Sequence, residues 1–127
     1  MAQTKPSDRA ARGTGDSVFD YDGTMQRLGG DRELFDELVQ VFLEDSADLM
    51  QRLQDAIERN DGRAIEHAAH TLKGLTLNFG APQAVSAAAT IEEQARAGNH
   101  HDVVRMVPQL QDAVGKLTRA LRPSTAT

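Results

Sequence analysis

Hydrophobic residues recur every three or four positions through most of the chain, which is the period of an amphipathic helix. The longest such run extends from Asp31 to about Arg59, with charged and amide side chains in between. Its recurring positions are Phe35, Val39, Phe42, Leu43, Ser46, Leu49, Met50, Leu53 and Ile57. Asp31 follows two glycines and is a favoured N-cap residue, so we expect this helix to begin there.

The same pattern predicts a second long helix after the turn signal Asn-Asp-Gly at 60–62. Its inward stripe consists of Ile65, Ala69, Leu72, Thr76 and Phe79. Gly80 suits the left-handed conformation that ends many helices, and Pro82 suits the first position of the next helix.

Two more helices complete the pattern. The third is predicted from Pro82 to Gly98, and the fourth over the heptad-like stretch 103–121. Pro108 lies inside that last stretch, and it should either kink the helix or mark its true start. The pair His100 and His101 is interpreted as part of the loop before it.

The predicted fold class is all-α: an up-and-down antiparallel four-helix bundle, preceded by a short extra helix over Tyr21–Leu28. The bundle should occupy residues 19–122. Residues 1–18 are small and polar, with Pro6 and two glycines, and cannot bury enough surface to fold, so we expect a flexible lead there and a flexible tail over 123–127.

The composition excludes several classes of function. The chain has 127 residues, enough for one domain, and its formal net charge of -5 would repel a nucleic acid. It contains no cysteine, which excludes disulfides and thiolate metal sites. The sequence contains neither a signal peptide nor eighteen consecutive apolar residues, so we expect a cytoplasmic protein that does not bind membranes.

One group of residues on the second long helix stands out. At 100° per residue His70 points about 140° away from Ile65, on the exposed side, and Lys73, Gly74 and Leu77 lie within about 60° of it. A glycine in a helix interior costs about 1 kcal/mol relative to alanine, and Leu77 would be left in water. Such a patch indicates that a partner docks there.

The chemistry of this patch favours phosphoryl transfer. An exposed imidazole is largely neutral at pH 7, so a ring nitrogen of His70 can attack phosphorus without a separate base. Lys73, one turn on, is a cation that would keep the ring uncharged and then attract phosphoryl oxygens. Gly74 leaves room for a partner, and Leu77 offers it an apolar contact.

Residues 69–81, AHTLKGLTLNFGA, resemble the signature of histidine phosphotransfer (HPt) domains, in which a histidine is followed by Lys-Gly and then by Asn and Gly-Ala. The resemblance covers about residues 19–121. It implies that His70 is the phosphoacceptor, that Lys73 contacts the phosphoryl group, that Gly74 gives a partner access, and that Asn78 and Gly80 shape the helix end.

The resemblance also implies a role and partners. The chain would take a phosphoryl group from the aspartyl phosphate of one receiver domain, in a response regulator or hybrid histidine kinase, and return it to the aspartate of another. It would need no cofactor of its own, because Mg²⁺ would belong to the receiver, and it would be no kinase. We expect a monomer.

Other interpretations use the same residues. A helical interaction module could bind a response regulator through the patch without phosphorylation. A metal site could combine His67 and His70 with Glu66 and with His100 or His101, although the histidine spacing of zinc proteases is absent. His67 is otherwise a solvated neighbour of His70.

Two further features are given ordinary structural interpretations. Gly115-Lys116 lacks the first glycine of a phosphate-binding loop, because position 110 is a leucine, so it is taken as part of the last helix. Glu92 and Glu93 are predicted to form a solvated face of the third helix.

Overall fold

The computed structural model describes residues 18–122, and they form five helices without a strand. The short helix α2 spans Tyr21–Arg27. The four long helices are α3 (Arg32–Glu58), α4 (Gly62–Leu77), α5 (Pro82–Arg96) and α6 (His100–Leu121). The predictions for residues 1–17 and 123–127 lie outside the described residues.

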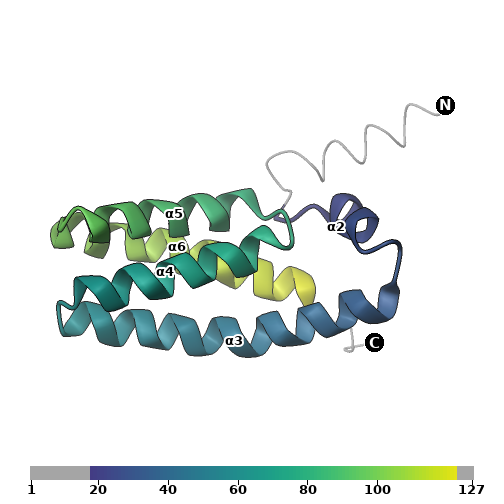
Figure 1. Ribbon diagram of the computed structural model, residues 1–127, viewed down its shortest axis with the longest axis horizontal. Coiled ribbons are helices and arrows are strands. Elements are labelled where there is room, and N and C mark those ends of the chain that lie inside the picture. The colour runs from purple at the N-terminus through teal and green to yellow at the C-terminus, as the bar shows by residue number, and fades with distance from the viewer. Residues whose placement is uncertain (1–17, 123–127) are drawn as a thin grey trace.

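The long helices run alternately up and down, as Figure 1 shows. α4 packs against α3 and α5, while α6 packs against α5 and α3, so α4 and α6 occupy opposite corners of the bundle. The predicted all-α, antiparallel four-helix bundle with a short N-terminal helix is confirmed. Short connections enforce this arrangement, since sequential helices joined by a few residues must reverse direction.

Local signals set the helix boundaries much as expected. The Asp31 side chain accepts a hydrogen bond from the backbone N–H of Leu34 at 3.0 Å, which caps α3. Gly80 has a φ of 57°, in the left-handed region, and Pro82 is the first residue of α5. The predicted inward stripe of α4, from Ile65 to Phe79, is buried.

The structure contradicts one prediction about the last helix and excludes one of the two alternatives for Pro108, that it marks the helix start. α6 begins at His100, so the two histidines are helical, because Gly98, with a φ of 80°, and Asn99 complete the turn before them. Pro108 neither starts the helix nor ends it. Pro108 and Val104 are both exposed, so the Val104 carbonyl that loses its partner four residues on can bond water.

The aromatic side chains gather at one end of the core. Phe79 is 1% exposed, and its ring lies edge-on to those of Phe19, Phe35 and Phe42, with centroids 6.3, 6.1 and 5.6 Å away. Edge-to-face ring pairs add to the free energy of burial. This cluster joins the segment before α2 to α3 and to the end of α4.

None of the helices formed by residues 18–122 combines the length and the apolar character that a membrane span requires.

Candidate functional site

The exposed side of α4 presents the histidine that the sequence singled out. α4 is capped by Asp61, whose side chain accepts from the Ala64 N–H at 3.1 Å, and its inward stripe is anchored in the core. These contacts fix the rotation of the helix about its axis. The His70 side chain is consequently 64% exposed, and Leu77, 59% exposed, lies two turns further along.

Glu92 on α5 is the unexpected member of the site. It was predicted to lie on a solvated face, but it is 4% exposed, whereas Glu93 is exposed as predicted. Its Oε2 atom lies 2.8 Å from Nδ1 of His70, and its Oε1 atom lies 2.8 Å from Nζ of Lys73. The prediction for Glu92 was wrong because these partners come from a neighbouring helix and make burial of the carboxylate possible.

A second cation extends this cluster along α5. Arg96 donates from Nη2 to Oε2 of Glu92 at 3.0 Å and from Nε to Oε2 of Glu66 on α4 at 2.8 Å. Glu66, and to a lesser extent Glu92, raises the pKa of the Arg96 guanidinium. With Lys73, the cluster contains two carboxylates and two cations, so its formal charges cancel.

The charge state of Glu92 decides which nitrogen of His70 is available. The ammonium of Lys73, foremost, and also the imidazole of His70 hold the pKa of Glu92 below its ordinary value of 4.5, although burial opposes this. At neutral pH the carboxylate is therefore ionised and can only accept hydrogen bonds. Nδ1 of His70 must then be the donor, and in the neutral ring the lone pair belongs to Nε2.

Because the pKa of Glu92 is depressed, part of the free energy of unfolding should be lost in acid. In the unfolded chain the carboxyl titrates near its ordinary value of 4.5, so below that pH the unfolded state binds more protons than the folded state. The contribution of Glu92 to the free energy of unfolding should be complete above pH 4.5 and be lost as the pH falls toward the folded pKa. Urea unfolding at neutral pH and at about pH 3.5 measures it.

Two glutamine variants provide the comparison for this measurement. Glu92→Gln cannot titrate, so its stability should fall less between the two pH values than that of the wild type. Glu93→Gln, at the exposed neighbour, should behave as the wild type does. An equally steep loss in the wild type and in Glu92→Gln would contradict the assignment of this acid sensitivity to Glu92.

Lys73 and Gly74 occupy the places that the helical spacing predicted, with one difference. The Lys73 side chain is 33% exposed, and its ammonium is directed to Glu92 in the structure rather than standing free beside the imidazole. A Cβ atom added at Gly74 would meet nothing within 4 Å. No contact within the described residues therefore requires a glycine at this position.

Asn78 and Gly80 lie at the end of α4, where the helix is attached to α2. Asn78 is the C-cap residue, and its backbone carbonyl accepts from Nη2 of Arg27 at 2.9 Å. The N–H of Asp20 donates to the carbonyl of Phe79 at 2.9 Å. A Cβ at Gly80 would lie 3.0 Å from Cβ of Asp20, so the positive φ and this close approach both favour glycine.

The structure brings together His70, Lys73 and Glu92. The other histidines lie outside this group. His67 is exposed one turn before His70, as predicted. Within residues 18–122 there is no group of three His, Asp or Glu side chains placed to hold a metal ion. The proposed donors of such a site, His100 and His101, lie in the first turn of α6.

One signal in the sequence could have revealed Glu92. On the wheel of α5 its position lies about 40° from Ala88 and about 60° from Ala95, at the edge of the stripe that also contains Ile91. All three of these residues are buried. A carboxylate at the edge of an apolar stripe is rarely buried unless it is paired, so a cation should have been sought on a neighbouring helix.

Comparisons with known proteins identify a family and a fold. The family model described as the Hpt domain matches residues 37–120. The fold is similar to that of histidine-containing phosphotransfer protein B (HptB) from Pseudomonas aeruginosa PAO1, with a TM-score of 0.76, 22% identity, and coverage of 82% of this chain and 90% of that chain. No sequence among the curated proteins matches the chain.

A second solved structure has the same fold: the HPT domain from the Hpt sensor hybrid histidine kinase from Shewanella. The TM-score is 0.72 and the identity is 19%, with 82% of this chain and 90% of that chain covered.

Proposed function

Since the chain belongs to the Hpt domain family, we propose that it is a phosphorelay intermediate of two-component signalling. His70 accepts a phosphoryl group from the aspartyl phosphate of one receiver domain and passes it to the aspartate of another. The observation that supports this best is the exposed imidazole of His70, hydrogen-bonded through Nδ1 to a buried, ionised carboxylate. This contact leaves Nε2 as the reacting nitrogen.

The transfer step follows from that hydrogen bond. The lone pair on Nε2 attacks the phosphorus atom of the aspartyl phosphate, the Nε2–P bond forms, and the P–O bond to the aspartate breaks, so that the carboxylate leaves with the electron pair. The ring keeps its proton on Nδ1 and becomes positively charged. The Glu92 carboxylate, 2.8 Å from Nδ1, stabilises this charge, and it does so equally when the reaction runs in reverse.

Lys73 has one role before the transfer and another after it. Before the transfer its ammonium is paired with Oε1 of Glu92. In the phosphorylated state we assign it to the phosphoryl oxygens, which carry more negative charge than one carboxylate oxygen. Magnesium and the acidic pocket that holds it belong to the receiver, so this chain supplies the nucleophile, the cation and a docking surface.

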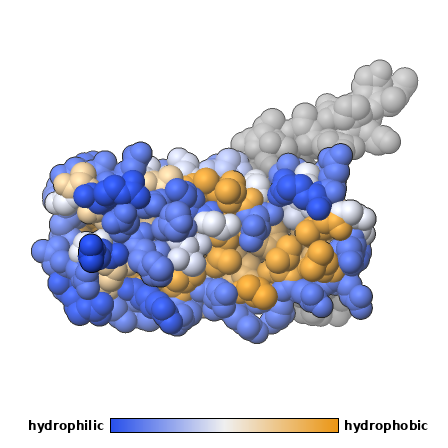
Figure 2. Space-filling model, in the orientation of Figure 1, coloured by the Kyte–Doolittle hydropathy of each residue, from blue (hydrophilic) through white to orange (hydrophobic). Residues whose placement is uncertain are grey.

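Gly74 and Leu77 supply the docking surface next to His70. Gly74 costs about 1 kcal/mol in helix stability relative to alanine, and no neighbour in the described residues requires it. Leu77 is the most exposed large hydrophobic side chain among those residues. Both features are explained by a partner that covers them, and Figure 2 shows hydrophobic surface over the half of this face nearer α2.

The direct test is transfer in two steps. A receiver domain carrying a radiolabelled aspartyl phosphate is mixed with the chain, and the label should move to His70 as an acid-labile, base-stable N–P bond. Addition of a second, unlabelled receiver should then remove the label. A chain that takes no label from phosphorylated receivers of its own cell would contradict the proposal.

Glu92→Gln is expected to slow phosphorylation of His70 by about fivefold. Glutamine can still accept from Nδ1, but a hydrogen bond to a neutral acceptor contributes about 1 kcal/mol less than one to a charged acceptor. The initial rate of labelling by a phosphorylated receiver measures the effect, with Glu93→Gln as the matched control. Unchanged labelling by Glu92→Gln would show that Glu92 does not position or stabilise the ring.

A further inference from the structure

The outward residues of α4 form one stripe whose chemistry changes along the helix. Arg63, His67, His70, Gly74 and Leu77 follow at steps of three and four, and all five are exposed. Before His70 the stripe is basic, and after it the stripe is small and apolar. The reacting imidazole therefore lies at a boundary between a polar surface and an apolar one.

Arg63 is a cation without a direct partner in the part of the chain that the structure describes. It makes no hydrogen bond or ion pair with any residue of 18–122, whereas the nearby Arg96 and Lys73 are both paired. Arg63 and His67 line a shallow hollow between α4 and α5 together with His70, Glu66, Glu92 and Arg96. The two carboxylates in this hollow are already neutralised, so Arg63 is its surplus charge.

The position of Arg63 is also unfavourable for the helix. It is the second residue of α4, whose first turn contains no acidic residue. The N-terminus of a helix carries a partial positive charge, so a cation there costs about 0.3–1 kcal/mol. Acidic residues lie in the first turns of α2, α3 and α6. The interaction with the helix dipole therefore does not account for an arginine at this place.

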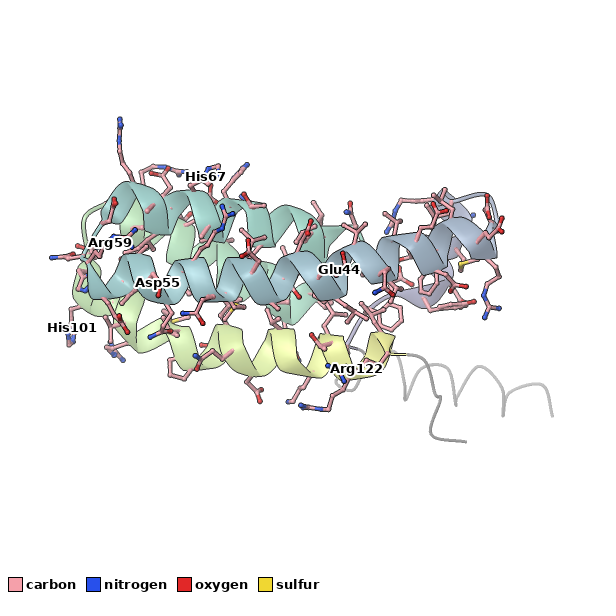
Figure 3. The ribbon with its side chains drawn as sticks, turned by 90° about the horizontal axis from the view of Figure 1, so that it is seen from below. Glu44, Asp55, Arg59, His67, His101 and Arg122 are labelled. Carbon is pink, nitrogen blue, oxygen red and sulfur yellow. The ribbon has the colours of Figure 1, made fainter. Side chains whose placement is uncertain are left out.

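The basic part of the stripe lies away from the apolar surface. Figure 2 shows hydrophilic residues over the end of the bundle opposite α2, and Figure 3 shows His67 and Arg59 toward that same end. Leu77 and Arg63 thus lie on opposite sides of His70 along one helix. A partner that covers His70 can touch both.

We propose that Arg63 is a docking residue that pairs with an acidic side chain on the receiver that exchanges its phosphoryl group with His70. The inference rests on the proposed function. Arg63 lies seven positions before His70, a rise of about 10 Å along the helix, so the acidic contact should lie about that far from the reacting aspartate of the receiver. Because the whole chain has a formal charge of -5, an acidic partner is repelled elsewhere and attracted here.

The test compares Arg63→Glu with Arg105→Glu, which makes the same change in net charge. Arg105 lies on α6, the helix at the corner opposite α4. Each variant is labelled in two ways: by a phosphorylated receiver, which must dock, and by phosphoramidate, a small donor that needs no docking surface. Thermal unfolding confirms the fold, and Arg63→Glu should not destabilise it, since glutamate favours a helix N-terminus.

Arg63→Glu is expected to slow labelling by the receiver at least about tenfold and to make that rate less dependent on salt concentration. Labelling by phosphoramidate should be unchanged. Arg105→Glu and the charge-conserving Arg63→Lys should stay near the wild-type rate. Labelling of Arg63→Glu by the receiver at the wild-type rate would overturn the inference. Equal slowing with both donors would overturn it too, because Arg63 would then act on His70 itself.

The same experiment separates this inference from the proposed function. If the wild type takes label from neither donor, His70 is no phosphoacceptor and the proposed function fails. If the wild type is labelled by both donors and only the Arg63 result is negative, the proposed function stands and the docking role alone is lost.

Discussion

Replacing His70 with glutamine is expected to abolish labelling by a phosphorylated receiver while leaving the bundle folded. Glutamine has no nucleophilic ring nitrogen, so the N–P bond cannot form. The His70 side chain is 64% exposed, and the amide of glutamine can still donate to the buried Glu92 carboxylate, so stability should change by less than about 0.5 kcal/mol. Acid-labile radiolabel after transfer, together with a circular dichroism melt, measures both parts of this result.

His67→Gln is the matched control for this variant, because His67 is an exposed histidine one turn earlier on the same stripe. It should be labelled normally. Acid-labile label retained by His70→Gln would contradict the assignment of the phosphoacceptor. The variant also separates a relay from an interaction module: a relay should lose signalling in cells but still bind its receiver, whereas a module would keep both.

Replacing Phe79 with alanine is expected to lower the free energy of unfolding by about 3–5 kcal/mol. The ring is 1% exposed and touches three other phenylalanines, from α3 and from the segment before α2. Its removal takes away apolar burial and three edge-to-face contacts, and it leaves a cavity at the end of α4. Urea unfolding monitored by circular dichroism gives the change.

Leu77→Ala provides the comparison, two residues earlier at the last position of α4. Leu77 is 59% exposed, so its truncation should change stability by less than about 0.5 kcal/mol. It should instead weaken receiver docking, whereas Phe79→Ala should mainly lower the free energy of unfolding. A Phe79→Ala variant as stable as the wild type would show that the aromatic cluster does not hold α2 and α4 together.

The outward position of His70 could be predicted from the sequence because it depends on one helix alone. The period of the apolar positions defines the buried face of α4, and His70 must then point outward whatever the helix packs against. The resemblance of residues 69–81 to the HPt signature suggested roles for the residues around His70. The roles of Lys73, Gly74 and Leu77 remain predictions, and the structure adds that Lys73 is paired with Glu92.

The hydrogen-bond partner of His70 could not be found in this way. Glu92 is 22 residues from His70 in the chain and reaches it only because α4 and α5 pack side by side at one particular axial register. A one-dimensional pattern specifies which face of each helix is buried but not how far one helix slides along the next. The prediction of a solvated face at 92–93 failed for that reason.

The sequence by itself determined the number of long helices, their direction and the exposed stripe of α4, since apolar spacing and turn residues are local properties. Only the tertiary structure decided which atoms meet: Nδ1 of His70 with Glu92, Arg96 with both Glu66 and Glu92, and the backbone of Asp20 with the end of α4. Contacts between helices depend on packing geometry, which forms only when the whole bundle closes.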